Sequence, residues 1–310
     1  MSHIHEKATI FPGRSIYEIR RRFEVLNYKT VKYSVTKDRI ARIILNKPER
    51  FNAIDHELAK ELEQAIHEAN RDDNVHVIIL EGAGKGFCGG FDLKAFAEGE
   101  SEWNQEMPWD PLIDYRMMKQ FSERFQSLWK SYKPTIAKVH GAAVAGGSEL
   151  ALSCDFTIMT ESAKIGYPPA RVWGCPITGM WVYRLGVEKA KRMLLTGDVI
   201  TGKEAKTMGL VLDAVPEEQL EDEVLKLARR MTGVPKNQLI MQKLMINTAY
   251  ENMGLATTQV MATLFDGVTR HSPEGIAFRE HAAREGFPAA VKLRDSGKPL
   301  PGSKPTPEGL

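Results

Sequence analysis

Two glycine-rich turns and one glutamate are the features of this sequence that could do chemistry. The first turn, residues 81–93, reads EGAGKGFCGGFDL, and the second, residues 139–150, reads VHGAAVAGGSEL. Glycines allow a backbone to approach a ligand closely and leave its N–H groups exposed. A helix start near Asp92, and another just before Glu149, would add N–H groups that have no partner inside the helix and can hold an anion. The second turn also places the carboxylate of Glu149 where it could move a proton.

Neither turn matches a nucleotide-binding motif. Phe87 occupies the position of the third glycine of the dinucleotide fingerprint, and no acidic strand end follows at the usual distance. A phosphate-binding loop is excluded as well, since no Gly-Lys pair is followed by Ser or Thr. Taken alone, each turn is equally typical of tight packing, and Glu149 is typical of a helix start, where the helix dipole favours an acid.

Strands and helices alternate around these turns. Apolar runs predict strands at residues 40–45, 75–80, 135–139 and 156–159. Apolar residues on one face predict a helix that Asp55 caps, and another over residues 117–129. This alternation predicts an α/β architecture with crossover connections.

The last third of the chain is helical in pattern. Thr201 and Glu204 form a capping-box start, and Ser272 followed by Pro273 begins another helix. Between them we expect helices at residues 217–230, 236–250 and 256–268. From residue 298 the chain is rich in Pro and Gly, which is typical of a disordered tail.

Composition restricts the class of protein. In 310 residues, 42 Lys and Arg face 40 Asp and Glu, and a formal charge of +2 gives no support for nucleic-acid binding. No apolar run approaches the roughly 20 residues of a membrane span, and the first residues lack the apolar core of a signal peptide. Three cysteines are too few for a disulfide framework, and their spacing gives no metal signature. We expect a soluble cytoplasmic protein without metal, nucleic acid or membrane contact.

Together, and in this order, the two turns resemble the signatures of the crotonase (enoyl-CoA hydratase/isomerase) superfamily. Residues 45–54, LNKPERFNAI, are similar to the family's first signature, and further matches follow at Asp155 and at residues 184–186, 194–198, 205 and 209–210. The resemblance implies a crotonase spiral core of stacked ββα turns (33–233) and a helical C-terminal module (234–297). The residue pattern adds an N-terminal arm (1–32) and a tail (298–310). The resemblance also implies contact with neighbouring subunits in trimers or dimers of trimers.

The same resemblance implies a site for an acyl-CoA thioester. The backbone N–H groups of Phe91 and Gly146 would hold the thioester oxygen, where each such donor stabilises the developing enolate by roughly 2.7–4 kcal/mol. Phe91, Asp92, Leu93 and Lys94 would line the CoA side, with Lys94 near a phosphate. The family usually has a small residue at position 91, so the Phe91 ring should reshape the acyl pocket. Coenzyme A enters as part of the substrate, and no separate cofactor is expected.

Glu149 matches the first of two catalytic glutamates that hydratases use, and would act as general base toward water with a pKa raised by burial. The second glutamate of hydratases is missing. Residues 165–169 read IGYPP, so Pro169 stands at its position and cannot carry a proton. Ile177 likewise stands where dienoyl isomerases have an aspartate.

Three substitutes for that glutamate are open. Glu149 could handle both protons through one water, which we prefer because it needs only the residue that the motif already provides. Another group, such as Tyr167, Arg171 or Asp114, could enter the site. The reaction could also differ, for example thioester or carbon–carbon hydrolysis.

The favoured activity is therefore an enoyl-CoA hydratase, which adds water to a 2-enoyl-CoA thioester. The alternatives are an isomerase or CoA-ester hydrolase of the same fold, and a weakly catalytic CoA-binding scaffold. The aromatic-rich segment at residues 103–115 fits a bulky or cyclic acyl group as well as it fits ordinary packing.

Overall fold

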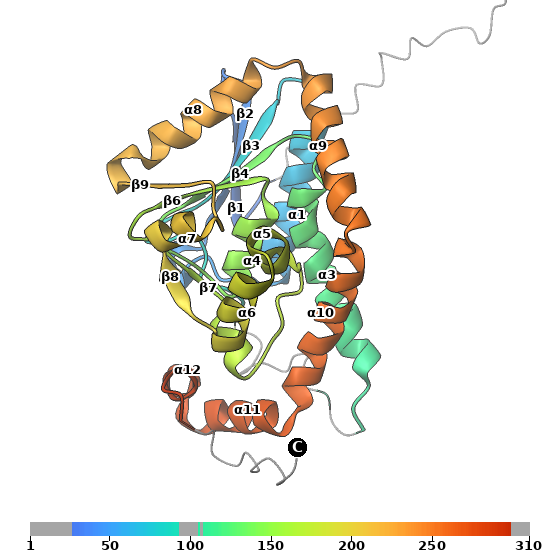
Figure 1. The fold of residues 1–310 in the computed structure, drawn as a ribbon, viewed down its shortest axis with the longest axis vertical. Helices are drawn as coiled ribbons and strands as arrows, with labels where there is room; N and C mark the ends of the chain where they lie inside the picture. Colours follow the sequence, from blue (N-terminus) through green and yellow to red (C-terminus); the bar gives the residue numbers. More distant parts are fainter. Residues whose placement is uncertain (1–26, 93–104, 106–107, 299–310) are drawn as a thin grey trace, which may run out of the picture.

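A six-stranded sheet forms the centre of the fold (Figure 1). The computed structural model describes residues 27–92, 105 and 108–298. The strand order is β1-β2-β3-β4-β6-β9, in which β1 is antiparallel to β2 and the other neighbours are parallel. The parallel order confirms the predicted α/β class. The strands are β1 Val31–Val35, β2 Ile40–Leu45, β3 Val77–Gly82, β4 Thr135–Val139, β6 Phe156–Thr160 and β9 Asp213–Val215.

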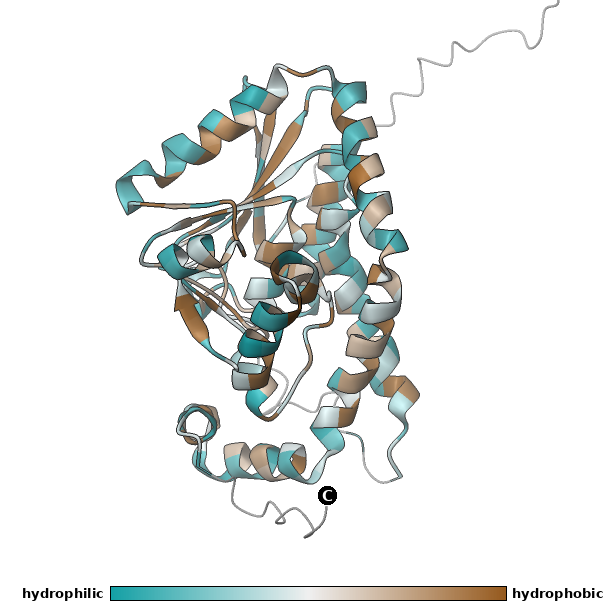
Figure 2. Ribbon diagram, in the orientation of Figure 1, coloured by the Kyte–Doolittle hydropathy of each residue, from teal (hydrophilic) through white to brown (hydrophobic). Residues whose placement is uncertain are grey.

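The central strands are buried on both faces, because alternate side chains enter two different cores. Ile78 and Leu80 point into the larger core, which they share with α1 (His56–Arg71) and α3 (Pro111–Trp129). Val77 and Ile79 point the other way, against the apolar side of α8 (Leu220–Thr232). Figure 2 shows the corresponding pattern on α8, where hydrophobic patches alternate with hydrophilic ones.

Capping residues fix the starts of several helices, as the sequence predicts. The Asp55 carboxylate accepts a hydrogen bond from the N–H of Leu58 at 2.8 Å, and Ser272 caps α11 (Pro273–Glu285) in the same way. Thr201 and Glu204 form the predicted capping box of α7 (Gly202–Met208). The helix expected over residues 117–129 begins earlier, at Pro111, because Asp110 caps it and proline suits the first helical turn.

A second, three-stranded sheet was not predicted. It consists of β5 (Ala142–Val144), β7 (Lys164–Gly166) and β8 (Val199–Thr201) in the order β5-β7-β8. Strands of three residues are too short to carry a period-two pattern, so the sequence gives little sign of them. The other short elements among the described residues are η1 Pro48–Arg50, α4 Gly146–Ser153, η2 Pro168–Arg171, α5 Met180–Leu185, α6 Val187–Thr196 and η3 Glu217–Gln219.

Of the C-terminal helices, α9 (Lys236–Asn252) and α10 (Leu255–His271) run along one side of the sheet core, and α11 and α12 (Phe287–Asp295) lie below it (Figure 1). Helices α9 and α10 follow one another around Gly254, which has a φ of 91°. Helix α10 packs against α3 of the same chain, and α11 packs against α12. The return of α10 onto α3 matters for the site described next.

Strand β1 begins at Val31, within the range 1–32 that the sequence suggests for an arm. Residues 1–26 and 299–310, most of the expected arm and tail, lie outside the described residues. In the part of the chain that the structure describes, no helix is both long and apolar enough to cross a membrane.

Candidate active site

The second glycine turn leads directly into α4 and sets the position of Glu149. Ala145 takes an unusual backbone conformation for a residue with a side chain, φ 52° and ψ −127°, and Gly146 is the first residue of the helix. The N–H groups of Ser148 and Glu149 donate to the carbonyl of Ala145. Strained conformations of this kind persist where the surrounding structure demands them. Here the strain turns the chain sharply, so that Glu149 follows one turn later in a fully buried helix.

The carboxyl group of Glu149 has two different oxygens. Oε1 accepts a hydrogen bond from the N–H of Thr178 at 2.9 Å, whereas Oε2 has no hydrogen-bond partner among the described residues. Burial raises the pKa of Glu149 to about 8, with the nearby carboxyl of Asp266 acting in the same direction and the Thr178 hydrogen bond opposing both. A carboxyl that titrates near neutral pH with one oxygen unengaged can act as a general acid or base.

The two glycine turns lie in contact at the residues expected to supply the N–H groups. A Cβ on Gly90 would lie 3.5 Å from the nitrogen of Gly146, and a Cβ on Gly146 would lie 3.0 Å from the ring of Phe91. Ile54 donates to the carbonyl of Gly90 and accepts from the N–H of Asp92. Because successive N–H groups of extended backbone alternate in direction, the N–H of Phe91 points away from Ile54. The structure thus brings residues 91 and 146 together.

The Phe91 ring lies against α3 and narrows the space beside Gly146. It packs edge-on against Phe121 at 5.2 Å between ring centroids and stacks on Phe125 at 5.9 Å. The ring is only partly buried, so one part of it faces the space outside this aromatic contact. A side chain of this size forms a wall where a small residue would leave room.

Asp92 is held by cations from the segment that resembles the first family signature. Its carboxylate lies 2.5 Å from the guanidinium of Arg50 and 3.8 Å from the ammonium of Lys47, and its side chain is 2% exposed. Leu93 and Lys94, the other residues predicted for the CoA side, lie outside the described residues. Trp103 of the aromatic-rich segment does so too.

The three auxiliary candidates, Tyr167, Arg171 and Asp114, differ in whether they lie near Glu149. Arg171 bonds to the carbonyl of Thr196 at 2.8 Å and to Asp295 at 3.0 Å, so its cation is directed to α6 and α12 and not to Glu149. Tyr167, in contrast, is buried beside Glu149, and burial together with the charge of that carboxylate raises the pKa of its phenol well above the usual value.

Asp114, the third candidate, belongs to a buried polar network under α10. It accepts a hydrogen bond from the indole of Trp109 at 2.6 Å and lies 2.8 Å from Nε2 of His271. The guanidinium of Arg270 lies 3.7 Å from Asp114 and 3.2 Å from Asp266. Of the acids in this network, Asp266 is the one whose charge acts on the Glu149 carboxyl.

Asp266 and Thr178 are the site residues that the sequence patterns did not single out. Asp266 is buried, and it accepts a hydrogen bond from the N–H of Cys175 at 3.2 Å. A signal for it exists in α10, because Gln259, Thr263, Asp266 and Arg270 recur at the spacing of one helix face and are all buried. Polar side chains on the buried face of a helix need partners, and so indicate a site or a network.

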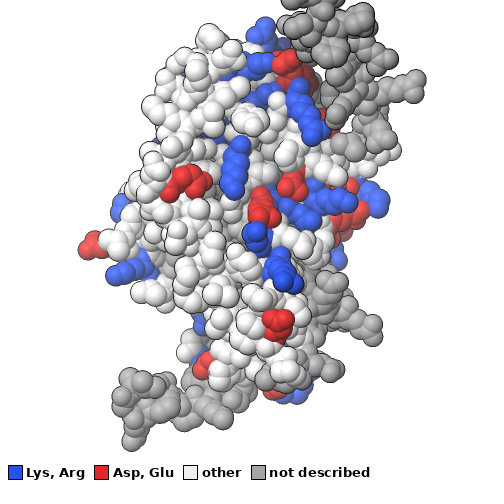
Figure 3. Space-filling view, turned by 90° about the vertical axis from the view of Figure 1, so that its right-hand side faces the viewer, with Lys and Arg blue, Asp and Glu red and all other residues white. Residues whose placement is uncertain are grey.

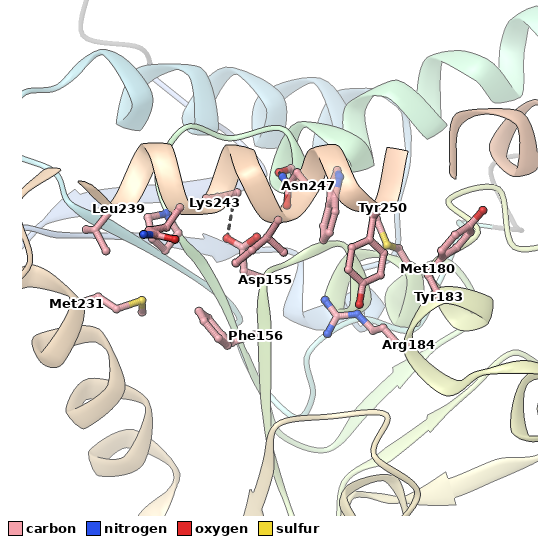
Figure 4. A pocket seen from close by; sticks show the side chains of 14 residues that line it. Asp155, Phe156, Met180, Tyr183, Arg184, Met231, Leu239, Lys243, Asn247 and Tyr250 are labelled. Atoms are coloured by element: carbon pink, nitrogen blue, oxygen red, sulfur yellow. Dashed lines mark hydrogen bonds and ion pairs between the residues drawn. The ribbon is translucent and has the colours of Figure 1, made fainter. Parts of the chain in front are cut away.

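A pocket of about 290 Å³ elsewhere in the chain is separate from this chemistry (Figure 4). It lies between α9, α5 and the start of β6, and no predicted site residue lines it. Its polar lining includes Asp155, whose carboxylate accepts from Lys243 at 2.7 Å and from the N–H of Thr135 at 2.7 Å. Asp155, one of the family matches, therefore joins β4, β6 and α9 and has a structural role.

Comparisons with known proteins agree with this geometry. A family model described as enoyl-CoA hydratase/isomerase matches residues 35–283. A crystal structure of an enoyl-CoA hydratase from Mycobacterium smegmatis is 46% identical, covers 86% of this chain and 94% of that chain, and has a TM-score of 0.81. An enoyl-CoA hydratase/isomerase from Xanthobacter autotrophicus Py2 is 34% identical over 88% of this chain and 99% of that chain, with a TM-score of 0.79.

A relative with a more specific name is also similar. The hydroxycinnamoyl-CoA hydratase-lyase of Pseudomonas fluorescens is 31% identical over 221 residues, which are 69% of this chain and 76% of that protein. The family model, the relatives and the fold confirm the family that the two turns indicated. The chain belongs to the enoyl-CoA hydratase/isomerase family, the crotonase superfamily.

Proposed function

We propose that this protein is an enoyl-CoA hydratase, which adds water across the double bond of a 2-enoyl-CoA. One observation carries the proposal. Glu149 is a fully buried carboxyl with one oxygen held by Thr178 and the other without a partner among the described residues, and it lies one helical turn after Gly146. Its pKa of about 8 lets it accept a proton near neutral pH.

The N–H groups of Phe91 and Gly146 are proposed to hold the thioester oxygen. The contact between residues 90–91 and 145–146 supports this assignment, and so does the position of Gly146 at the start of α4, where an N–H has no partner within the helix. As water bonds to the β carbon, negative charge moves to that oxygen, and donors aimed at it stabilise the enolate. Asp92, Leu93 and Lys94 would then follow the CoA moiety, and the reaction would consume only water and the thioester.

The acyl group is proposed to be bulky rather than long and thin. The partly exposed ring of Phe91 forms an aromatic wall beside Gly146, backed by the fully buried Phe121 and Phe125. Trp109 lies at the end of α10, stacked on His271 at 4.5 Å. Aromatic walls of this kind favour flat or cyclic groups, which they contact by edge-on and stacked packing. A substrate panel with aromatic, cyclic and linear 2-enoyl-CoA thioesters tests this directly.

Association into trimers or dimers of trimers is part of the proposal. Apolar side chains are exposed along α9 and α10, namely Met241, Leu244, Met245, Ile246, Val260, Met261, Phe265 and Val268. Figure 3 views this side of the molecule, where uncharged surface separates scattered charges. Exposed apolar patches of this extent are typical of protein interfaces. Light scattering after gel filtration should give the mass of three or six chains.

The experiment that tests the function compares Glu149→Gln with wild type on the same thioester panel. Wild type should hydrate at least one member, and Glu149→Gln should lose about 100-fold or more in kcat, the usual contribution of general acid–base catalysis. Glu61→Gln is the matched control, because Glu61 is a buried glutamate on α1 that holds the backbone of residues 29 and 30 instead. Equal rates for wild type and Glu149→Gln would contradict the proposal, and product mass spectrometry separates hydration from isomerisation or hydrolysis.

A further inference from the structure

Hydration needs two proton transfers, and Glu149 accounts for one of them. A base must take a proton from the attacking water, and an acid must give one to the α carbon. Asp266 is the carboxyl group whose charge acts on Glu149 and raises its pKa. Glu149 is fully buried, and Asp266 is 6% exposed. The pKa of Asp266 is itself raised by burial.

One short loop holds both carboxyl groups. The N–H of Cys175 donates to Asp266 at 3.2 Å, and three residues later the N–H of Thr178 donates to Glu149 at 2.9 Å. Helix α10 is fixed to the same loop by Gln259, whose amide donates to the carbonyl of Thr178 at 3.0 Å. The two acids therefore come from different elements, α4 and α10, and are set relative to one another by a common stretch of backbone.

Asp266 also lies beside the position where the second glutamate is missing. A Cβ on Gly174 would lie 3.3 Å from Oδ1 of Asp266, 3.3 Å from Cβ of Pro169 and 3.2 Å from the hydroxyl of Tyr167. These three groups thus surround one small space next to Gly174. The side chain of a glutamate at position 169 would begin at that Cβ, so its carboxyl could reach the region that the Asp266 carboxyl occupies.

We propose that the Asp266 carboxyl group is the second proton-carrying group of the site and delivers the proton to the α carbon. This inference rests on the proposed hydratase function. The oxygen of water bonds to the β carbon while one of its protons passes to the Glu149 carboxylate and the double-bond electrons move to the thioester oxygen. The enolate electrons then form the bond between the α carbon and the Asp266 proton. Transfer of the proton from Glu149 to Asp266 restores the starting state.

The decisive experiment measures the two proton-transfer steps separately. Wild type, Glu149→Gln and Asp266→Asn are compared for hydration of the panel and for exchange of the α hydrogens of a saturated acyl-CoA in D₂O. Asp266→Asn should lose about 100-fold or more in kcat and in exchange, as expected for loss of a general acid or base, with KM and calorimetric affinity within threefold. Glu149→Gln should lose hydration but keep exchange. Exchange that is lost in Glu149→Gln and kept in Asp266→Asn would overturn the proposal.

Asp114→Asn is the matched control for a merely electrostatic role, since Asp114 and Asp266 both face Arg270. It should reduce kcat less than tenfold, and an equal loss in both variants would overturn the proposal. Pro169→Glu in the Asp266→Asn background should recover at least tenfold in kcat, because it returns a carboxyl to the same space. If Asp266→Asn fails to fold, Asp266→Glu replaces it and should lower kcat at unchanged KM.

The outcomes distinguish this inference from the proposed function. A wild type that exchanges α hydrogens but hydrates nothing overturns the hydratase proposal, while loss of exchange in Asp266→Asn still supports the role of Asp266. Hydration that survives in Asp266→Asn overturns the inference and leaves the function intact. A wild type that binds acyl-CoA but shows neither reaction overturns both.

Discussion

The N–H of Thr178 donates to Oε1 of Glu149 at 2.9 Å, so a loop between η2 and α5 holds the carboxyl that α4 carries. This single hydrogen bond orients the group without satisfying it, because Oε2 has no partner among the residues described. A buried carboxyl with one donor is costly to ionise. That cost makes both activity and stability depend on pH in a way that can be measured.

The first prediction concerns pH. The groups that face Glu149 are Asp266 from α10 and Tyr167, Cys175 and Thr178 from the neighbouring segment. Burial and the charge of Asp266 raise the pKa of Glu149 from 4.5 to about 8, against the opposing effect of the Thr178 hydrogen bond. A general base must be ionised, so kcat/KM should rise as the pH increases toward about 8. A profile that is flat from pH 6 to 9 would contradict this.

Stability should change in the opposite sense. The folded state holds the Glu149 proton more tightly than the unfolded chain does, so the stabilisation present below about pH 4.5 is lost as the pH rises to about 8. Glu149→Gln cannot ionise and should be more stable than wild type at pH 9, by about 2 °C or more in Tm. Thermal unfolding of both proteins at pH 5, 7 and 9 tests the sign, and the gain should shrink at pH 5.

The second prediction concerns the contact between the two glycine turns. A Cβ on Gly147 would lie 2.2 Å from the carbonyl oxygen of Cys88, and backbone on both sides prevents an easy shift. Gly147→Ala should therefore destabilise the fold by about 1–3 kcal/mol and displace the N–H groups of the site, with a larger loss in kcat than in affinity.

Gly233→Ala is the control for this substitution. Gly233 has a φ of −78°, and the atom nearest to an added Cβ lies 3.5 Å away, so alanine fits without strain. Its effect should be neutral or slightly stabilising, because alanine lowers the entropy of the unfolded chain. Denaturant unfolding of the two variants compares them directly, and equal stability would show that the turns can separate at little cost.

The third prediction concerns the buried ion pair of Asp155 and Lys243. The two side chains, joined by the dashed line in Figure 4, are 14% and 7% exposed. Lys243 also donates to the carbonyls of Leu128 and Lys133. Lys243→Met leaves an uncompensated carboxylate and should cost about 3–5 kcal/mol of unfolding free energy. Adding Asp155→Asn should recover part of the loss. The kcat of the folded fraction should not change, since the pair lies apart from Glu149.

Sequence patterns predict those parts of the fold whose signals are local. Asp55, Thr201 and Ser272 cap the helices expected of them, because a cap is decided by residues three positions apart. The three-stranded sheet has no such signal, because strands such as Ala142–Val144 are held by partners distant in the chain and not by their own pattern. Tertiary pairing decides such segments.

The residues of the candidate site likewise differ in whether a local motif or a tertiary contact identifies them. Glu149, Phe91 and Gly146 lie inside motifs, so their types and spacing are enough to single them out. Asp266 lies more than 100 residues further on, in a helix with no motif. Tertiary contacts of α10 with α3 and with the loop that holds Glu149 bring it near that residue. Arg171 shows the converse, since its place close to Pro169 in the chain made it a candidate, yet its cation bonds to Asp295.

The last prediction concerns the acyl pocket. Because only the N–H of residue 91 is proposed to act on the thioester, its side chain can be changed without removing that donor. Phe91→Leu should open space beside Gly146 while keeping part of the contact with Phe121 and Phe125. We expect kcat/KM for the bulkiest thioesters of the panel to rise relative to that for the smallest, by about 10-fold or more, which corresponds to the 1–3 kcal/mol that a methylene-sized change in a pocket is worth. Phe125→Leu is the matched control, because Phe125 is a fully buried partner of the same ring stack. This substitution should lower Tm without changing the ratio of kcat/KM between the bulkiest and the smallest thioesters. A ratio that moves equally in both variants would show that the stack as a whole, and not residue 91, shapes the pocket.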